Sequence, residues 1–164
     1  MNTIPTIKST LIIGLDERRA KALAFVNPLS PDHIVHEDTG WTVKDLISHL
    51  TAFEADMIEA IQMFLDGEKY HLDLRGQASI DGFNEIRRQE YAHKTWEQAL
   101  DEWQMVRDQL RGVVIAFPES QLDTPFSTPF LQKNTLVQAI KGCGIHEKIH
   151  LREIMEATTH DTDA

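Results

Sequence analysis

The sequence has few of the residues on which secreted and membrane proteins depend. It contains one cysteine, Cys143, which excludes an intrachain disulfide and any CxxC or zinc-finger pattern. The first 15 residues have no basic segment leading into a long apolar run. No stretch approaches the ~20 apolar residues that span a bilayer. We therefore expect a cytoplasmic protein with no membrane partner.

Basic residues and turn residues are scarce as well. The chain has 16 Lys and Arg against 26 Asp and Glu, a net charge of −10. Such a surface repels phosphate backbones, so we expect no nucleic-acid partner. Only 8 glycines and 6 prolines argue against an all-β sandwich, while 41% hydrophobic residues suffice for one packed core. At 164 residues, the sequence predicts a single domain over residues 1–164.

Apolar residues recur at helical spacing in four segments and almost nowhere alternate with a period of two. The sequence therefore predicts an all-α protein, a four-helix bundle. The expected helices cover residues 10–26, 42–67, 80–117 in two pieces, and 135–157. A long polar connection between the second and third segments leaves the order of the helices in space open.

Local signals mark the beginnings of two helices. Thr42 is a good N-cap residue, with Asp45 at the third helical position. Thr95 and Gln98 form a capping box for the second piece of the third segment. In that piece Arg107 is assigned to the polar, solvent-facing side, opposite a continuous apolar face.

Two of the predicted helices carry polar side chains on the face that should be apolar. At about 100° per residue, Glu54 falls near the middle of the inward face of helix 42–67, and His49 lies at its edge. In helix 135–157, His146, Glu147 and His150 interrupt the apolar face in the same way. The two helices thus bring a polar layer into one core.

A metal ion is the simplest partner for such a layer, because buried ionisable groups are costly unless paired, hydrogen-bonded or metal-bound. His146 and His150 stand at i and i+4, a spacing that lets two imidazoles reach one ion. His49 could complete a three-histidine site that leaves coordination positions open for water or substrate. Taken alone, the i, i+4 pair is explained as well by ordinary surface or core histidines.

Residues 146–150 also satisfy the H-E-x-x-H motif of zinc peptidases. Glu153 and Glu156 stand where the extended motif has glycine and histidine, and only residues 151–164 follow. We therefore consider a peptidase the weaker interpretation.

A di-iron bundle is a second alternative. Glu90 and Glu147 each precede a histidine, His93 or His150, by three residues, as in di-iron bundles. The two pairs fall on the third and fourth helices instead of the second and fourth, and this order disfavours the alternative.

Other candidate side chains have plainer explanations. Cys143 lies one turn before His146 on the inward side and could be a ligand or a nucleophile. A small buried core residue is the simpler interpretation. His36, like the other loop histidines, is interpreted as a surface residue.

Three motifs carry a family resemblance. Residues 40–50, GWTVKDLISHL, followed by Glu54, resemble the W-[ST]-x-x-[DE]-x-x-x-H-L opening of the second helix in the DinB-like (DinB/YfiT-like) superfamily of metalloenzymes. Residues 81–85 are similar to the start of the third helix in its ClbS/DfsB-like and maleylpyruvate-isomerase-like branch. The spacing His146-x-x-x-His150-x-x-Glu153 resembles the last-helix metal motif. The motifs cover nearly the whole chain in the family's order.

The resemblance implies an up-down-down-up bundle that holds one divalent ion, zinc or nickel, through His49, His146 and His150. It implies reactions on electrophilic small molecules, including hydrolysis and transfers or isomerisations that use a low-molecular-weight thiol cosubstrate. Arg152 stands where many members have glycine, so we expect a pocket that differs from theirs.

The function expected from the sequence is that of a mononuclear metal-dependent enzyme acting on a small molecule. Bound water or a thiolate is the nucleophile, and Glu147 or Glu54 acts as general base or orients a ligand. The alternative is a non-catalytic bundle that sequesters a toxic compound. The apolar run of residues 11–13 also leaves a side chain for a homodimer surface.

Overall fold

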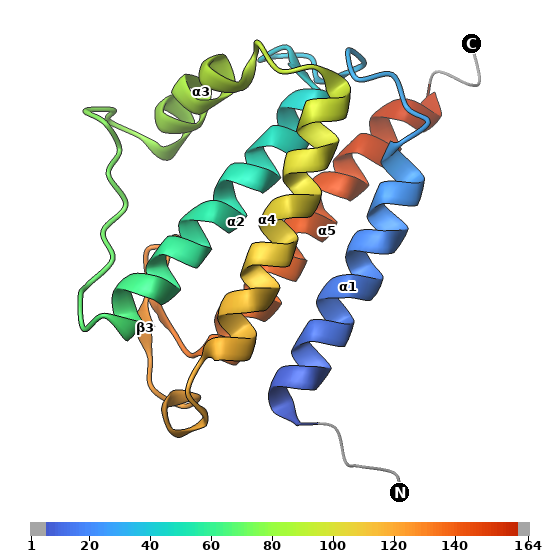
Figure 1. Ribbon diagram of the computed structural model, residues 1–164. Coiled ribbons are helices and arrows are strands. Elements are labelled where there is room, and N and C mark those ends of the chain that lie inside the picture. Colours follow the sequence, from blue (N-terminus) through green and yellow to red (C-terminus); the bar gives the residue numbers. More distant parts are fainter. Residues whose placement is uncertain (1–5, 161–164) are drawn as a thin grey trace, which may run out of the picture.

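Four long helices pack side by side, and a short helix, α3, lies beside α2 at one end (Figure 1). The structure is a computed structural model that describes residues 6–160. Its helices are α1 (Ile7–Val26), α2 (Val43–Leu65), α3 (Ile80–Tyr91), α4 (Trp96–Ala116) and α5 (Leu136–His160), with a 3-10 turn at Glu119–Gln121. The prediction of an all-α four-helix bundle is confirmed.

The long helices run up, down, down and up (Figure 1). Helices α2 and α4 are parallel because residues 66–95, which include α3, carry the chain back to the end where α2 began. Helix α2 packs against both α4 and α5, and α1 packs against the same two helices. This connectivity brings α2 and α5, far apart in the sequence, into contact.

The caps explain where the helices begin. The Thr42 hydroxyl accepts from the backbone N–H of Asp45, and the Asp45 carboxylate accepts from the N–H of Thr42. Thr95 and Gln98 form the same reciprocal pair on α4. Helix α1 begins three residues earlier than expected, because the Thr6 hydroxyl accepts from Ser9 N–H.

Two short antiparallel ribbons were not expected from the sequence. Strand β1 (Ile34–His36) pairs with β2 (Trp41–Thr42), and β3 (Phe126–Ser127) pairs with β4 (Lys133–Asn134). Strands of two or three residues are too short for an alternating pattern to show. In the first ribbon His36 lies opposite Trp41, and the turn is closed by Gly40 with φ of +73°.

The core consists of two apolar clusters. One gathers Leu15, Met57, Leu110 and Ile140 with their neighbours, and the other gathers Val26, Leu46, Trp103 and Ile154 with theirs. Each long helix also contributes one charged residue that is at most 2% exposed, and these four form a buried charged layer: Arg19 from α1, Glu54 from α2, Arg107 from α4 and Glu147 from α5.

In the described part of the chain, no helix is both long and apolar enough to cross a membrane. On α1, Leu11 is buried and Ile12 packs against the core, while Ile13 is exposed. The homodimer surface expected there stays a prediction.

Candidate metal centre

Three histidines from two helices meet at one side of the bundle. His49 of α2 and His150 of α5 each lie close to His146 of α5. The Nε2 atom of His146 is 3.2 Å from Nε2 of His49 and 3.1 Å from Nε2 of His150. The structure thus brings together the three residues that the sequence predicted as ligands, and all three are half-buried.

These separations fit the coordination sphere of one ion. With metal–nitrogen bonds of about 2.0–2.1 Å, tetrahedral ligands stand about 3.3 Å apart and adjacent octahedral ligands about 3.0 Å apart. The two separations from His146, 3.1 and 3.2 Å, lie between these values, and the three ligand atoms all lie within 4.8 Å of one another. Imidazole suits zinc, nickel, copper and iron, so the donor set fits a divalent transition metal without selecting one.

The surroundings keep the imidazoles of His49 and His146 in the neutral form that binds metal. Burial, together with the neighbouring histidines, lowers the pKa of His49 to about 3. Burial and His150 lower the pKa of His146 to about 4. A neutral ring has a nitrogen lone pair to donate to an ion, whereas an imidazolium has none.

Aromatic rings pack against two of the three histidines. Phe53, one turn after His49 on α2, packs against His146 with ring centroids 4.3 Å apart and the ring planes tilted by 51°. Trp41 contacts His49 edge-on at 5.7 Å. These contacts restrict the rotamers of both imidazoles before an ion arrives.

Glu153, for which the sequence indicated no separate role, lies beside the third candidate ligand, His150. Oε2 of Glu153 lies 2.7 Å from Nδ1 of His150 and 3.2 Å from Nε2 of His36. Although burial alone raises the pKa of Glu153, the hydrogen bonds from His150 and His36 lower it below its ordinary value. A carboxylate on the second ring nitrogen is the usual partner of a metal-binding histidine.

A cavity of about 490 Å³ opens beside the histidines. His49 and His150 line it together with Trp41 and Leu46, and the remaining lining residues come from β1, the β1–β2 turn and α3: His36, Thr39, Asp81, Asn84 and Glu85. Most of the lining residues are polar, yet most of the surface that they expose to the cavity is apolar, as is typical of small-molecule sites. His36 therefore lies at the site, although its position in a loop had suggested a surface residue.

A local ion pair fixes Glu85, one of the residues of α3 that line this cavity. Glu85 accepts from Nε and Nη2 of Arg88 at 2.8 and 2.6 Å, and from the Trp41 indole at 3.2 Å. The hydrogen bond from Arg88 lowers the pKa of Glu85 to about 2. Trp41 is thus held between a metal-site histidine and α3.

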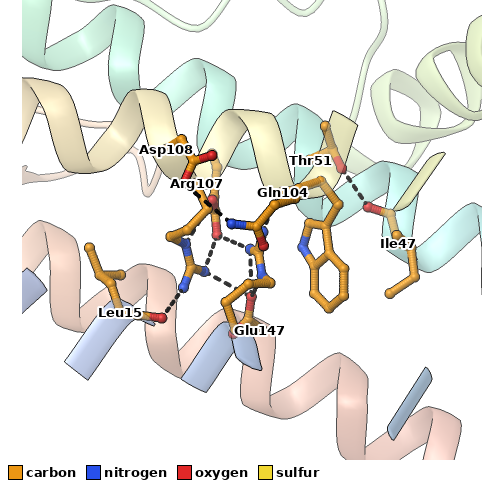
Figure 2. Close-up of polar contacts among 10 residues, drawn as sticks. Leu15, Ile47, Thr51, Gln104, Arg107, Asp108 and Glu147 are labelled. Atoms are coloured by element: carbon orange, nitrogen blue, oxygen red, sulfur yellow. Dashed lines mark hydrogen bonds and ion pairs between the residues drawn. The ribbon is translucent and has the colours of Figure 1, made fainter. Parts of the chain in front are cut away.

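Glu54 and Glu147, expected as general base or orienting group, are placed in the buried charged layer. Glu147 Oε2 accepts from Nη2 of Arg107 at 2.8 Å (Figure 2). The same oxygen accepts from Nη2 of Arg19, also at 2.8 Å. Glu54 also accepts from both arginines, at 2.8 Å from Nη2 of Arg19. Two guanidiniums therefore balance two carboxylates, and this placement favours a structural role for both glutamates.

Arg107 was assigned to the solvent-facing side of its helix, and this assignment is wrong. Its exposed fraction is 1%, and Nη1 also donates to the carbonyl of Leu15 at 2.8 Å (Figure 2). The signal was present: Arg107 lies four residues after Trp103 and three before Leu110, on the apolar stripe, and Arg19 holds the same place between Leu15 and Ala22.

The remaining sequence candidates lie away from the triad. Glu90 forms an exposed ion pair with Arg75, and so does not face the histidines as a di-iron ligand would. The bonds of Glu147 to two arginines also remove the carboxylate that the peptidase alternative requires. Cys143 is buried in an apolar cluster, and burial raises the pKa of its thiol far above the ordinary value.

Three imidazoles beside a cavity, carried by a four-helix bundle, form a candidate site for a metal ion. The sequence model of the DinB superfamily matches residues 14–154, and the chain belongs to this superfamily. No match is found among curated proteins.

Two solved structures share the fold. An uncharacterised protein from Escherichia coli UTI89 superposes with a TM-score of 0.74 at 16% identity, covering 97% of this chain and 96% of that one. YfiT from Bacillus subtilis superposes with a TM-score of 0.71 at 18% identity, covering 99% of this chain and 92% of that one. YfiT is described as "a probable metal-dependent hydrolase with an unusual four-helix bundle topology".

Proposed function

We propose that the protein is a metal-dependent enzyme that uses one divalent ion, zinc or nickel, held by His49, His146 and His150. The observation that carries this proposal is the convergence of three histidines, with Nε2 of His146 3.2 Å from that of His49 and 3.1 Å from that of His150. His49 and His150 also line a cavity of about 490 Å³. Three protein ligands leave coordination positions open, as catalytic sites require. An ion there would act as a Lewis acid and lower the pKa of a bound nucleophile.

The substrate in this proposal is an electrophilic small molecule. Trp41 gives the cavity an apolar surface for its body, and Asn84 supplies a neutral amide for orientation. The nucleophile is water, as in the activity described for YfiT, or a low-molecular-weight thiol that acts as cosubstrate. Hydrolysis and thiol transfer differ only in which of these two enters the cavity.

Turnover tests the proposal against simple sequestration of a ligand. Zinc-loaded and nickel-loaded protein would be incubated with panels of esters, epoxides and activated alkenes, with and without glutathione or cysteine. We expect many products per chain for at least one substrate, and loss of turnover in His150→Ala. The exposed loop residue His71 provides the control His71→Ala, which should keep full activity. Product that never exceeds one molecule per chain would indicate a binding protein and contradict the proposal.

A further inference from the structure

The site has three proposed ligand histidines and a fourth histidine, His36, which is not one of the ligands. This residue belongs to β1, outside the helices; it lines the cavity, and 33% of its side chain is exposed. We propose that His36 is the proton-transfer residue of the site and that Glu153 positions it. The inference rests on the proposed function, because it assumes a reaction in the cavity beside the triad.

The hydrogen bonds of Glu153 determine which nitrogen of His36 carries the proton. An ionised carboxylate only accepts, so each ring nitrogen that faces it must donate. When His150 offers Nε2 to an ion, its proton is on Nδ1, 2.7 Å from Glu153 Oε2. Nε2 of His36 lies 3.2 Å from the same oxygen and donates too. The lone pair of a neutral His36 is therefore on Nδ1.

The other acidic side chains of the cavity are less suited to move a proton. Glu85 is occupied by Arg88, the Trp41 indole and the Gln89 amide, with distances of 2.6 to 3.2 Å. Asp81 is exposed in the first turn of α3. Outside the cavity, Glu54 and Glu147 are held by two buried arginines. His36 combines an exposed ring surface with a fixed partner.

The proposed step balances without a further reactant. Nδ1 of His36 takes the proton from the O–H or S–H of the attacking water or thiol, whose electron pair forms the new bond to the electrophilic carbon. The bond from that carbon to the leaving group breaks, and the imidazolium returns the proton to the leaving group. Glu153 accepts from Nε2 throughout and stabilises the imidazolium.

Nitrogen NMR of the zinc-loaded full chain tests the tautomer directly. We expect a protonated Nε2 and a bare Nδ1 for His36 at neutral pH, with loss of this preference in Glu153→Gln. The same variant should weaken zinc binding by about 10–100-fold, because it removes the partner of His150. A His36 ring with a bare Nε2 in the wild-type protein would overturn the proposal.

A kinetic comparison uses His36→Gln, whose side-chain amide can still donate to Glu153 but cannot carry a proton through the reaction. With p-nitrophenyl acetate, or a substrate found by the panel above, we expect kcat to fall about 10²–10⁴-fold while zinc affinity and KM stay unchanged. His71→Gln should match the wild type. Zinc binding with an unchanged kcat in His36→Gln contradicts the role of His36 alone, whereas a wild-type chain that binds no zinc contradicts the proposed function itself.

Discussion

The position of Glu147 shows how surroundings decide the role of a residue. The H-E-x-x-H spacing suggests a general base, yet the carboxylate is 2% exposed and bound by two arginines. A buried ion pair does not by itself make a fold more stable than an apolar core would. Loss of one partner, however, leaves an uncompensated buried charge. Glu147 is therefore required by the fold whether or not a reaction occurs.

The cost of removing one partner from the buried ion pairs gives a prediction about stability. Glu147→Gln should lower the free energy of unfolding by about 3–5 kcal/mol, because Arg19 and Arg107 would share one remaining carboxylate. Glu156 on the same helix is the matched control: its side chain is 64% exposed and 3.8 Å from Arg152. Glu156→Gln should cost less than about 1 kcal/mol. Urea denaturation measures both values, and equal effects would show that the buried layer is not required for stability.

Cys143 supports a second prediction at the residue scale. The thiolate is the reactive form of cysteine, and burial raises the pKa of this thiol. The native protein should therefore react with Ellman's reagent far more slowly than the urea-unfolded chain. Rapid reaction of the native protein would restore Cys143 as a candidate nucleophile.

At the scale of elements, α5 carries two adaptations that helix propensity does not explain. A Cβ on Gly142 would lie 2.5 Å from the ring of Phe130, and one on Gly144 would lie 3.0 Å from the guanidinium of Arg18. Phe130 in turn contacts Phe53, which packs against His146. Gly142 thus makes room for the aromatic side chains that support a metal-site histidine.

Two glycine substitutions test this interpretation. Gly112 lies in α4 with no atom within 4 Å of a built Cβ, so Gly112→Ala should stabilise the protein by up to about 1 kcal/mol. Gly142→Ala should lose that gain, because Phe130 must move. Thermal unfolding compares the variants. A similar stabilisation by both would mean that Phe130 adapts without cost.

The elements could be predicted where their signals are local. The capping boxes at Thr42 and Thr95 involve residues three apart, so the sequence places the starts of α2 and α4 correctly. The ribbon that carries His36 could not be found in this way. Its strands are two and three residues long, and the partner of His36, Glu153, is 117 residues away.

At the scale of the whole molecule, helix periodicity predicts which histidines face inward but not which charges meet. His49, His146 and His150 interrupt apolar faces and were found from that pattern. The pairing of Glu54 with Arg19 and Arg107 depends on the order of helices around the bundle, which the long connections left open. The buried layer was therefore assigned to the metal, although its arginines balance the two glutamates.

A metal ion at the triad would link α2 to α5, which are separated in the sequence by residues 66–135. The central prediction for the whole molecule is that one ion binds there. Elemental analysis by plasma mass spectrometry, on protein purified without a metal-affinity tag, measures this directly. The native chain, a variant with His49→Ala, His146→Ala and His150→Ala, and the control His71→Ala would be compared after dialysis against zinc.

We predict about one zinc per chain in the native protein and in His71→Ala, and none in the triple variant. Bound zinc should also raise the midpoint of thermal unfolding in the native protein and leave that of the triple variant unchanged. Equal zinc content in the native protein and the triple variant, or no zinc in either, would contradict the three-histidine site.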